Sequence, residues 1–319
     1  MPETQQPSDA SLILPPAPLI NRRWVLCSAL GFLLFYLLLL SIAGWSIYHR
    51  KSNTSYDRLI GKIFPLPAVI VDGEVIPYNR YTWEVAAREQ YDAAHHMNTS
   101  QAATQAFVVN QLINQVLYSH ILQEHHITVT TTDVNKRVGE IENQIGGEAK
   151  LRAFLKDNYG PNIGLPQFNL WIRDSLDEAA IQQQLLTKAT VRHIVIKVPQ
   201  GASDDDVAAA KQRTLEVKAK ITSTDQFAQV AKDYSDDIAS RDKGGSLGTT
   251  VQGELSSYGA DFEKAIFSIP VGQVSDPIHS PYGWHLVIID KREGSINLSL
   301  DALIAQKRNQ VRTRIYVAH

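Results

Sequence analysis

The sequence predicts an α+β protein with an N-terminal transmembrane helix, a mainly helical region and a small antiparallel sheet with surrounding helices. An uncharged, apolar run over residues 24–48 predicts the membrane helix. Apolar residues at helical spacing through residues 100–187 predict the helical region. Two alternating apolar and β-branched runs, residues 191–195 and 282–288, predict strands of the sheet.

Composition excludes several classes of site and partner. A chain of 319 residues has room for one large domain or for two to three small ones. Its net charge of −2 gives no charge excess that would favour nucleic acid. The single cysteine, Cys27, excludes an intrachain disulfide and a thiolate metal cluster. Gly244 and Gly245 are not followed by the Lys-Ser/Thr of a phosphate loop. We therefore expect no cofactor, no metal and no nucleic-acid partner.

The N-terminal region predicts attachment to a lipid bilayer through residues 24–48. About 20 apolar residues at ~1.5 Å each cross a ~30 Å hydrocarbon core. We predict a disordered tail over residues 1–21, an anchor over 22–48 and a stalk over 49–67. A cleaved signal peptide is the alternative, although the apolar run is longer than the usual signal-peptide core.

The charges that flank the apolar run leave its orientation open. Arg22 and Arg23 precede it and favour a cytoplasmic N-terminus. Four basic residues between positions 50 and 62 follow it and favour the opposite orientation.

Residues 68–187 read as a short strand followed by several amphipathic helices. Glycine pairs and Gly-Pro steps, at Gly146-Gly147 and Gly160-Pro161, separate the later helices. One more amphipathic helix is predicted over residues 299–316. It is too short to be stable alone, so we expect it to fold back on the helices of residues 68–187 and complete a discontinuous domain.

Residues 189–294 have the order strand, helices, Gly-Gly strand, short helix and histidine strand. This order, with His193 in the first strand and His285 in the last, resembles the parvulin family of peptidyl-prolyl cis/trans isomerases. The resemblance covers about a hundred residues. The layout of the whole chain resembles the SurA/PrsA-type foldases, in which a parvulin domain is inserted in a helical chaperone domain before its final helix.

The resemblance implies a specific set of site residues. It places in the catalytic site His193, Asp237, Ser280 and His285, and in the pocket for the proline ring Leu255 and Phe262. The chain departs from the family pattern at Leu255, where the family often has Met. It also departs over residues 256–260, where the link before Phe262 is longer than usual.

The resemblance implies a membrane-anchored, exported isomerase and chaperone whose C-terminal body lies outside the cytoplasm. Its partners would be unfolded or nascent exported polypeptides that contain X–Pro bonds. Acidic residues 204–206 lie where phosphate-specific parvulins have basic residues, so phosphorylated substrates are not expected.

Two other functions stay open. The chain can be a binding-only holdase whose parvulin region is an inactive scaffold, or a component of a membrane secretion or quality-control complex. A lone strand histidine is usually structural. Two histidines together with Asp237 and Phe262 favour the enzyme.

Overall fold

The computed structural model describes residues 22–50, 59, 61–64 and 66–317. The predicted tail over residues 1–21 and most of the predicted stalk lie outside the described residues. The chain forms two compact units, residues 1–66 and 67–319, each of which is described by itself.

The first unit contains one long apolar helix, α1 (Arg22–Arg50). At 1.5 Å per residue its 29 residues extend about 43 Å. Large apolar side chains between Phe32 and Trp45 are exposed along it. Within the described part of the chain, α1 is the one helix whose length and composition suffice to cross a membrane. A signal sequence meets the same criteria.

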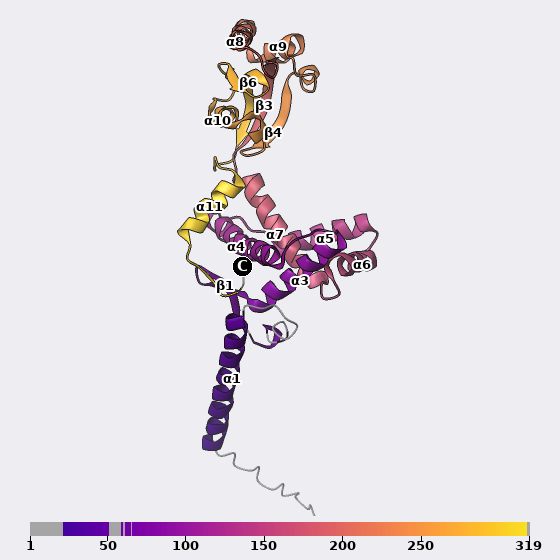
Figure 1. Ribbon diagram of the computed structural model, residues 1–319, viewed down its shortest axis with the longest axis vertical. Helices are drawn as coiled ribbons and strands as arrows, with labels where there is room; N and C mark the ends of the chain where they lie inside the picture. Colours follow the sequence, from indigo (N-terminus) through magenta and orange to yellow (C-terminus); the bar gives the residue numbers. More distant parts are fainter. Residues whose placement is uncertain (1–21, 51–58, 60, 65, 318–319) are drawn as a thin grey trace, which may run out of the picture. The chain divides into compact units, whose positions relative to one another are not determined.

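Five helices follow the start of the second unit (Figure 1). They are α3 (Tyr78–Ala94), α4 (Gln101–Glu124), α5 (Thr131–Ile145), α6 (Glu148–Tyr159) and α7 (Leu165–Gln184). Helix α4 begins where the Ser100 side chain accepts a hydrogen bond from the Ala103 amide, and α5 begins with a capping box of Thr130 and Asp133. Between α5 and α6 the chain turns at Gly146, whose φ of 93° favours glycine.

The end of the chain forms a strand, which corrects the predicted helix over residues 299–316. Helix α11 (Leu300–Gln310) ends before an extended Val311, and β7 (Thr313–Ile315) follows. Residues 311, 313, 315 and 317 are Val, Thr, Ile and Val, an alternation with period two that favours a strand. Strand β7 pairs antiparallel with β1 (Pro67–Val71), which also pairs with β2 (Glu74–Pro77). This pairing satisfies backbone groups along the edge of β1.

Helix α11 contacts α4 through its basic side chains. Lys307 forms an ion pair with Glu124. Arg308 donates hydrogen bonds to the side-chain oxygens of Asn110, at 2.8 Å, and Asn114, at 2.6 Å. These contacts join the segment after residue 299 to the helices. That residues 68–187 and 299–316 behave as one domain stays a prediction.

A four-stranded antiparallel sheet forms the rest of the second unit. Its order is β4-β3-β6-β5, formed by β3 (Lys188–Lys197), β4 (Ser246–Val251), β5 (Ile278–Ser280) and β6 (Gly283–Glu293). The helices around it are α8 (Asp204–Ala219), α9 (Phe227–Tyr234) and α10 (Ala260–Ser268), with the short 3-10 turns η1 (Thr224–Gln226), η2 (Arg241–Lys243) and η3 (Ser256–Tyr258). The predicted α+β fold class is confirmed.

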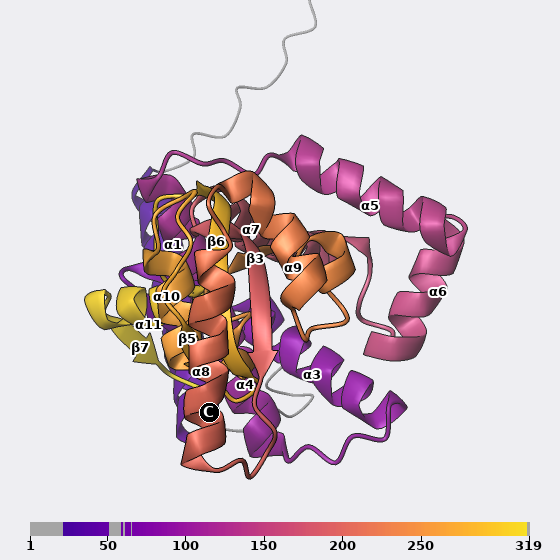
Figure 2. The same ribbon diagram turned by 90° about the horizontal axis from the view of Figure 1, so that it is seen from above.

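Alternation along the central strands gives the sheet two apolar faces. Ile194 of β3 and Leu286 of β6 pack with α8 and α9 on one face. Val191 of β3 and Val287 of β6 pack with α10 on the other. In Figure 2, strand β3 lies between α9 and α10. Odd-numbered residues of both strands therefore point toward α10.

Candidate active site

The two strand histidines meet at the centre of the sheet. His193 of β3 and His285 of β6 are 1% and 0% exposed. The register pairs His193 with Val287 and Val195 with His285, so the histidines are diagonal neighbours on the α10 face. Their Nδ1 atoms lie 3.4 Å apart, and their ring centroids are 5.5 Å apart. The structure thus brings together the two histidines that the sequence singled out.

Asp237 lies on the other side of His193, in the turn after α9. Its Oδ2 atom is 3.0 Å from Nε2 of His193, and Ser240 Oγ is also 3.0 Å from that nitrogen. The Ser240 hydroxyl donates to Asp237, and the Ala239 amide donates to Oδ1 at 3.2 Å. These donors fix the carboxylate, whose side chain remains 26% exposed.

Ser280 completes the line of hydrogen bonds at its other end. Its Oγ atom is 2.6 Å from Nε2 of His285 and accepts the Tyr282 amide at 3.0 Å. One assignment of protons satisfies every contact: Ser280 donates to His285, and His285 donates through Nδ1–H to His193. His193 then donates through Nε2–H to Asp237. The four residues therefore form a continuous chain with both imidazoles neutral.

The electrostatics agree with that assignment. Burial lowers the pKa of His193, although the hydrogen bond and charge of Asp237 partly offset it. Burial, together with repulsion from His193, lowers the pKa of His285 to about 3. Burial alone would raise the pKa of Asp237, but hydrogen bonds from Ser240, His193 and Ala239 outweigh it and lower that pKa. At neutral pH the site has one carboxylate beside two uncharged histidines.

The glycine pair before β4 allows the backbone to approach His193. The His193 amide donates to the carbonyl of Gly245 at 2.8 Å. Gly245 has a φ of 81°, and a Cβ atom there would lie 2.2 Å from the His193 carbonyl oxygen. Only glycine fits this position without displacing the strand.

The two residues predicted for the proline pocket lie on the same face of the sheet. Phe262 of α10 is fully buried, and its ring meets that of His285 edge to face at 4.7 Å. Leu255 packs, partly buried, against the same apolar cluster. The ring of Tyr258 stacks on Phe262 with centroids 4.7 Å apart and planes 19° apart. The structure therefore gathers all six predicted site residues and adds a tyrosine above Phe262.

Sequence reasoning missed Ser240, Tyr258 and Tyr282. Ser240 had a local signal, because a hydroxyl three residues after Asp237 can bond back to the carboxylate. Tyr258 lies within residues 256–260, which have no periodicity to indicate where an aromatic side chain points. In the structure its ring contacts those of His193, at 6.0 Å, His285, at 5.8 Å, and Tyr282, at 5.2 Å.

Comparison with known proteins identifies the region that contains this site. Residues 193–291 match the rotamase family model, described as the PPIC-type PPIase domain. Chaperone SurA of Chromobacterium violaceum is 38% identical over 123 residues, which are 39% of this chain and 27% of that protein. Foldase protein PrsA of Staphylococcus aureus is 25% identical over 194 residues, 58% of this chain and 60% of that protein.

Other relatives are PrsA proteins as well. Foldase protein PrsA 4 of Bacillus cereus is 28% identical over 197 residues, 57% of this chain and 62% of that protein. The crystal structure of PrsA from Bacillus anthracis aligns with 22% identity and a TM-score of 0.28, over 62% of this chain and 86% of that one. This chain thus spans about a quarter of the length of the SurA relative and about 60% of the PrsA relatives. Over residues 193–291 the chain carries a PPIC-type peptidyl-prolyl isomerase domain of the parvulin family.

Proposed function

We propose that this chain is a membrane-anchored peptidyl-prolyl cis/trans isomerase and chaperone that assists the folding of exported proteins. The hydrogen-bonded chain from Ser280 through His285 and His193 to Asp237 carries the proposal. It ends in a partly exposed carboxylate beside an aromatic cluster.

The chemistry requires no nucleophile. Rotation about an amide costs ~18–20 kcal/mol because the twisted bond loses its resonance. X–Pro bonds therefore exchange slowly, and a catalyst must bind the twisted amide better than the planar one. In the proposed mechanism Phe262 and Leu255 hold the pyrrolidine ring. Asp237 faces the substrate carbonyl, where charge is redistributed as the amide twists.

The two histidines have a positioning role in this mechanism. Both are buried and neutral, so neither is available to exchange protons with solvent at neutral pH. Their hydrogen bonds link Asp237 to Ser280 across the sheet and fix the carboxylate relative to α10. A preorganised charge of this kind costs little reorganisation when the amide twists.

One observation favours a second candidate function, a binding-only holdase with an inactive parvulin scaffold. Phe262 has no exposed surface, and the ring of Tyr258 stacks on its ring. A proline ring reaches Phe262 only after the tyrosine moves. If the tyrosine stays in place, the pocket is closed and the region binds chains without catalysis.

The names of the relatives, chaperone SurA and foldase PrsA, support binding of unfolded polypeptides. In our proposal the helical region of residues 68–187, with 299–316, binds such chains without regard to proline. Helix α1 anchors the protein in the bilayer as a single span, and the body after it lies outside the cytoplasm. Cleavage of α1 as a signal peptide is the alternative.

Two assays on the same preparation of the full chain in detergent test the proposal. The first measures isomerisation of an unphosphorylated X–Pro peptide, and the second measures suppression of aggregation of a denatured, proline-free client. The proposal expects activity in both. Suppression without isomerisation would establish the holdase, and isomerisation without suppression would remove the chaperone function.

A further inference from the structure

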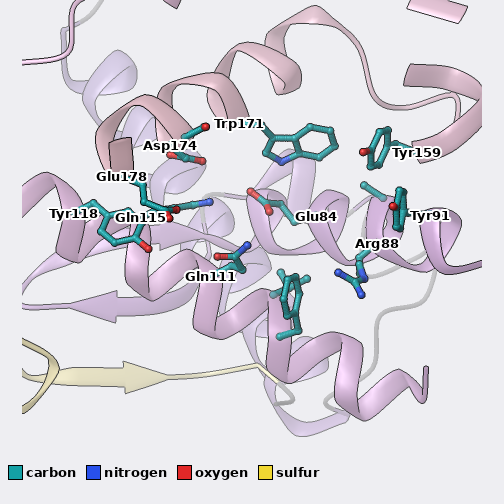
Figure 3. Close-up of a pocket in the computed structure, with 14 residues that line it drawn as sticks. Glu84, Arg88, Tyr91, Gln111, Gln115, Tyr118, Tyr159, Trp171, Asp174 and Glu178 are labelled. Atoms are coloured by element: carbon teal, nitrogen blue, oxygen red, sulfur yellow. The ribbon is translucent and has the colours of Figure 1, made fainter. Parts of the chain in front are cut away.

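A cavity of about 440 Å³ lies in the helical region, between α3, α4, α7 and the end of α6. It has the size of a ligand site rather than a packing defect. In Figure 3, Asp174, Glu178 and Tyr118 lie at one end, and Tyr91, Tyr159 and Arg88 lie at the other. The cavity therefore has an acidic end and an aromatic end.

The aromatic end is a continuous set of rings. Tyr91 stacks on Tyr159 at 5.4 Å, and Tyr159 contacts Trp171 at 5.0 Å. A cation already lies on this surface, because Cζ of Arg88 is 4.5 Å from the ring centroid of Phe107 and 5.9 Å from that of Tyr91. These rings can accept an aromatic side chain by stacking or a guanidinium by cation–π attraction.

The acidic end has more carboxyl groups, those of Glu84, Asp174 and Glu178, than basic groups. Arg80 donates to both Glu84, at 3.3 Å, and Asp174, at 2.9 Å, so one guanidinium is shared by two carboxylates. The bond to Glu178 comes from a neutral amide, that of Gln182 at 3.2 Å.

The second arginine near the cavity does not balance this charge. Arg88 forms an ion pair with Asp92, at 2.8 Å. Glu84 and Asp174 thus share one arginine, and the hydrogen bond described for Glu178 comes from an uncharged group. Burial raises the pKa of Asp174 to about 7 even though Arg80 opposes the shift. A further positive charge would stabilise the ionised carboxylates at this end of the cavity.

Helix α7 leaves one side of the cavity accessible. The helix has 20 residues, and only Ala180 and Ile181 are buried. Trp171 and Asp174 are half-buried. The rest of the structure only partly covers the side chains of α7, so a ligand can reach the cavity along this helix.

We propose that this cavity binds extended segments of unfolded polypeptides in which a lysine or arginine lies two residues from an aromatic side chain. The basic group lies against Asp174 and Glu178, and the aromatic ring lies on Tyr91 and Tyr159. Side chains two residues apart point the same way in an extended chain, so both enter the cavity from one strand. The inference rests on the proposed chaperone function and names the class of segment that it selects.

Peptide binding to the full chain in detergent micelles tests the acidic end. A fluorescent, proline-free Gly/Ser peptide carries Phe and Lys two residues apart, and a matched peptide carries Gln in place of Lys. Anisotropy titration is expected to give about tenfold tighter binding for the Lys peptide. In the Asp174→Asn/Glu178→Gln double variant this preference is expected to disappear. Asp177→Asn, on the same helix but outside the cavity lining, is expected to keep it.

A pair of phenylalanines tests the aromatic end. Phe107 lines the cavity and Phe154 does not, and both are 44% exposed. Phe107→Ala is expected to weaken binding of the Phe–Lys peptide several-fold. Phe154→Ala is expected to have a smaller effect, because its ring lies outside the lining and only meets Tyr159 edge to face at 6.3 Å. Equal effects of the two substitutions would overturn the placement of the aromatic ring.

The comparison of the Lys and Gln peptides uses the wild-type protein, so its result does not depend on whether a variant folds. Equal affinity for the Lys and Gln peptides, or an equal loss in Asp177→Asn, overturns the inference. If the protein still suppresses aggregation in that case, the chaperone function stands and only the selectivity fails. If it neither binds a peptide nor suppresses aggregation, the chaperone function itself fails.

Discussion

The ring of Tyr258 covers the ring of Phe262, with their centroids 4.7 Å apart and their planes nearly parallel. The tyrosine comes from η3, directly before α10. Its ring also contacts both site histidines. In the proposed mechanism, a proline ring on Phe262 would need the position that this tyrosine occupies.

Replacing this tyrosine tests whether it competes with substrate. We expect Tyr258→Ala to lower KM for an X–Pro peptide and to leave kcat nearly unchanged, because the peptide no longer displaces the ring. Steady-state kinetics on the full chain measure both constants. Tyr282→Ala is the matched control, since Tyr282 contacts Tyr258 at 5.2 Å and has no ring contact with Phe262 among those described. A fall in kcat in Tyr258→Ala would instead make Tyr258 part of the pocket wall.

The burial of Phe262 predicts a cost in stability as well as in activity. Phe262→Ala is expected to lower the free energy of unfolding by about 3–5 kcal/mol, because it leaves a cavity in the apolar cluster on the α10 face. Thermal or urea unfolding of the full chain, followed by circular dichroism, measures the loss. Phe262→Leu, which retains more of the volume, is expected to cost less. A change below 1 kcal/mol in Phe262→Ala would contradict the burial described here.

The histidine pair predicts a dependence of stability on pH. The pKa of His285 is about 3 in the folded protein, against an ordinary value of 6.5. Between pH 3 and 6.5 the imidazole of His285 is therefore protonated in the unfolded chain and neutral in the folded chain. The stabilisation is complete above pH 6.5 and is lost as the pH falls toward 3. We expect the difference in the free energy of unfolding between wild type and His285→Gln to shrink as the pH falls from 6.5 toward 3.

The ionisation of Asp174 changes stability with pH in the opposite direction to that of His285, so the two contributions must be measured in separate variants. Its pKa is raised to about 7 from 3.8, so its contribution is complete below pH 3.8 and is lost as the pH rises to 7. The stability of Asp174→Asn relative to wild type is expected to improve with rising pH. Unfolding curves of the three proteins at several pH values check both signs. A constant offset for either variant would contradict the corresponding shift.

The anchor and its orientation give a further prediction. Protease added to sealed spheroplasts is expected to remove the region after residue 49, because α1 would span the membrane with the body outside. Detergent-lysed spheroplasts serve as the control for intrinsic sensitivity. Protection of that region in sealed spheroplasts, with cleavage after lysis, would place the body in the cytoplasm.

The parts of the fold that follow from local patterns could be predicted from the sequence. The strand contexts of His193 and His285 indicated the sheet that the structure forms. The alternation of the strand after α11 is visible in the sequence. The amphipathic pattern before it nevertheless predicted a helix that continued to residue 316.

The details of the site depended on contacts between segments far apart in the chain. Tyr258 lies over Phe262 because of the path of residues 256–260, which no periodicity specifies. The approach of the two Nδ1 atoms depends on the register of β3 against β6. That register is set by packing on both faces of the sheet, and it shifts once between Thr190 and Val191.

The rate of cis/trans exchange in an unphosphorylated X–Pro peptide is the direct measure of whether this protein is an isomerase. Exchange spectroscopy measures this rate at pH 7 with the full chain, with Asp237→Asn and with the control Asp242→Asn, whose side chain is 68% exposed in η2. We expect wild type and Asp242→Asn to accelerate exchange. We expect Asp237→Asn to lose about tenfold or more in rate, or ~1.4 kcal/mol, with a small change in peptide affinity. An exchange rate that the wild-type protein leaves unchanged, while the peptide is bound, would contradict the proposed isomerase function.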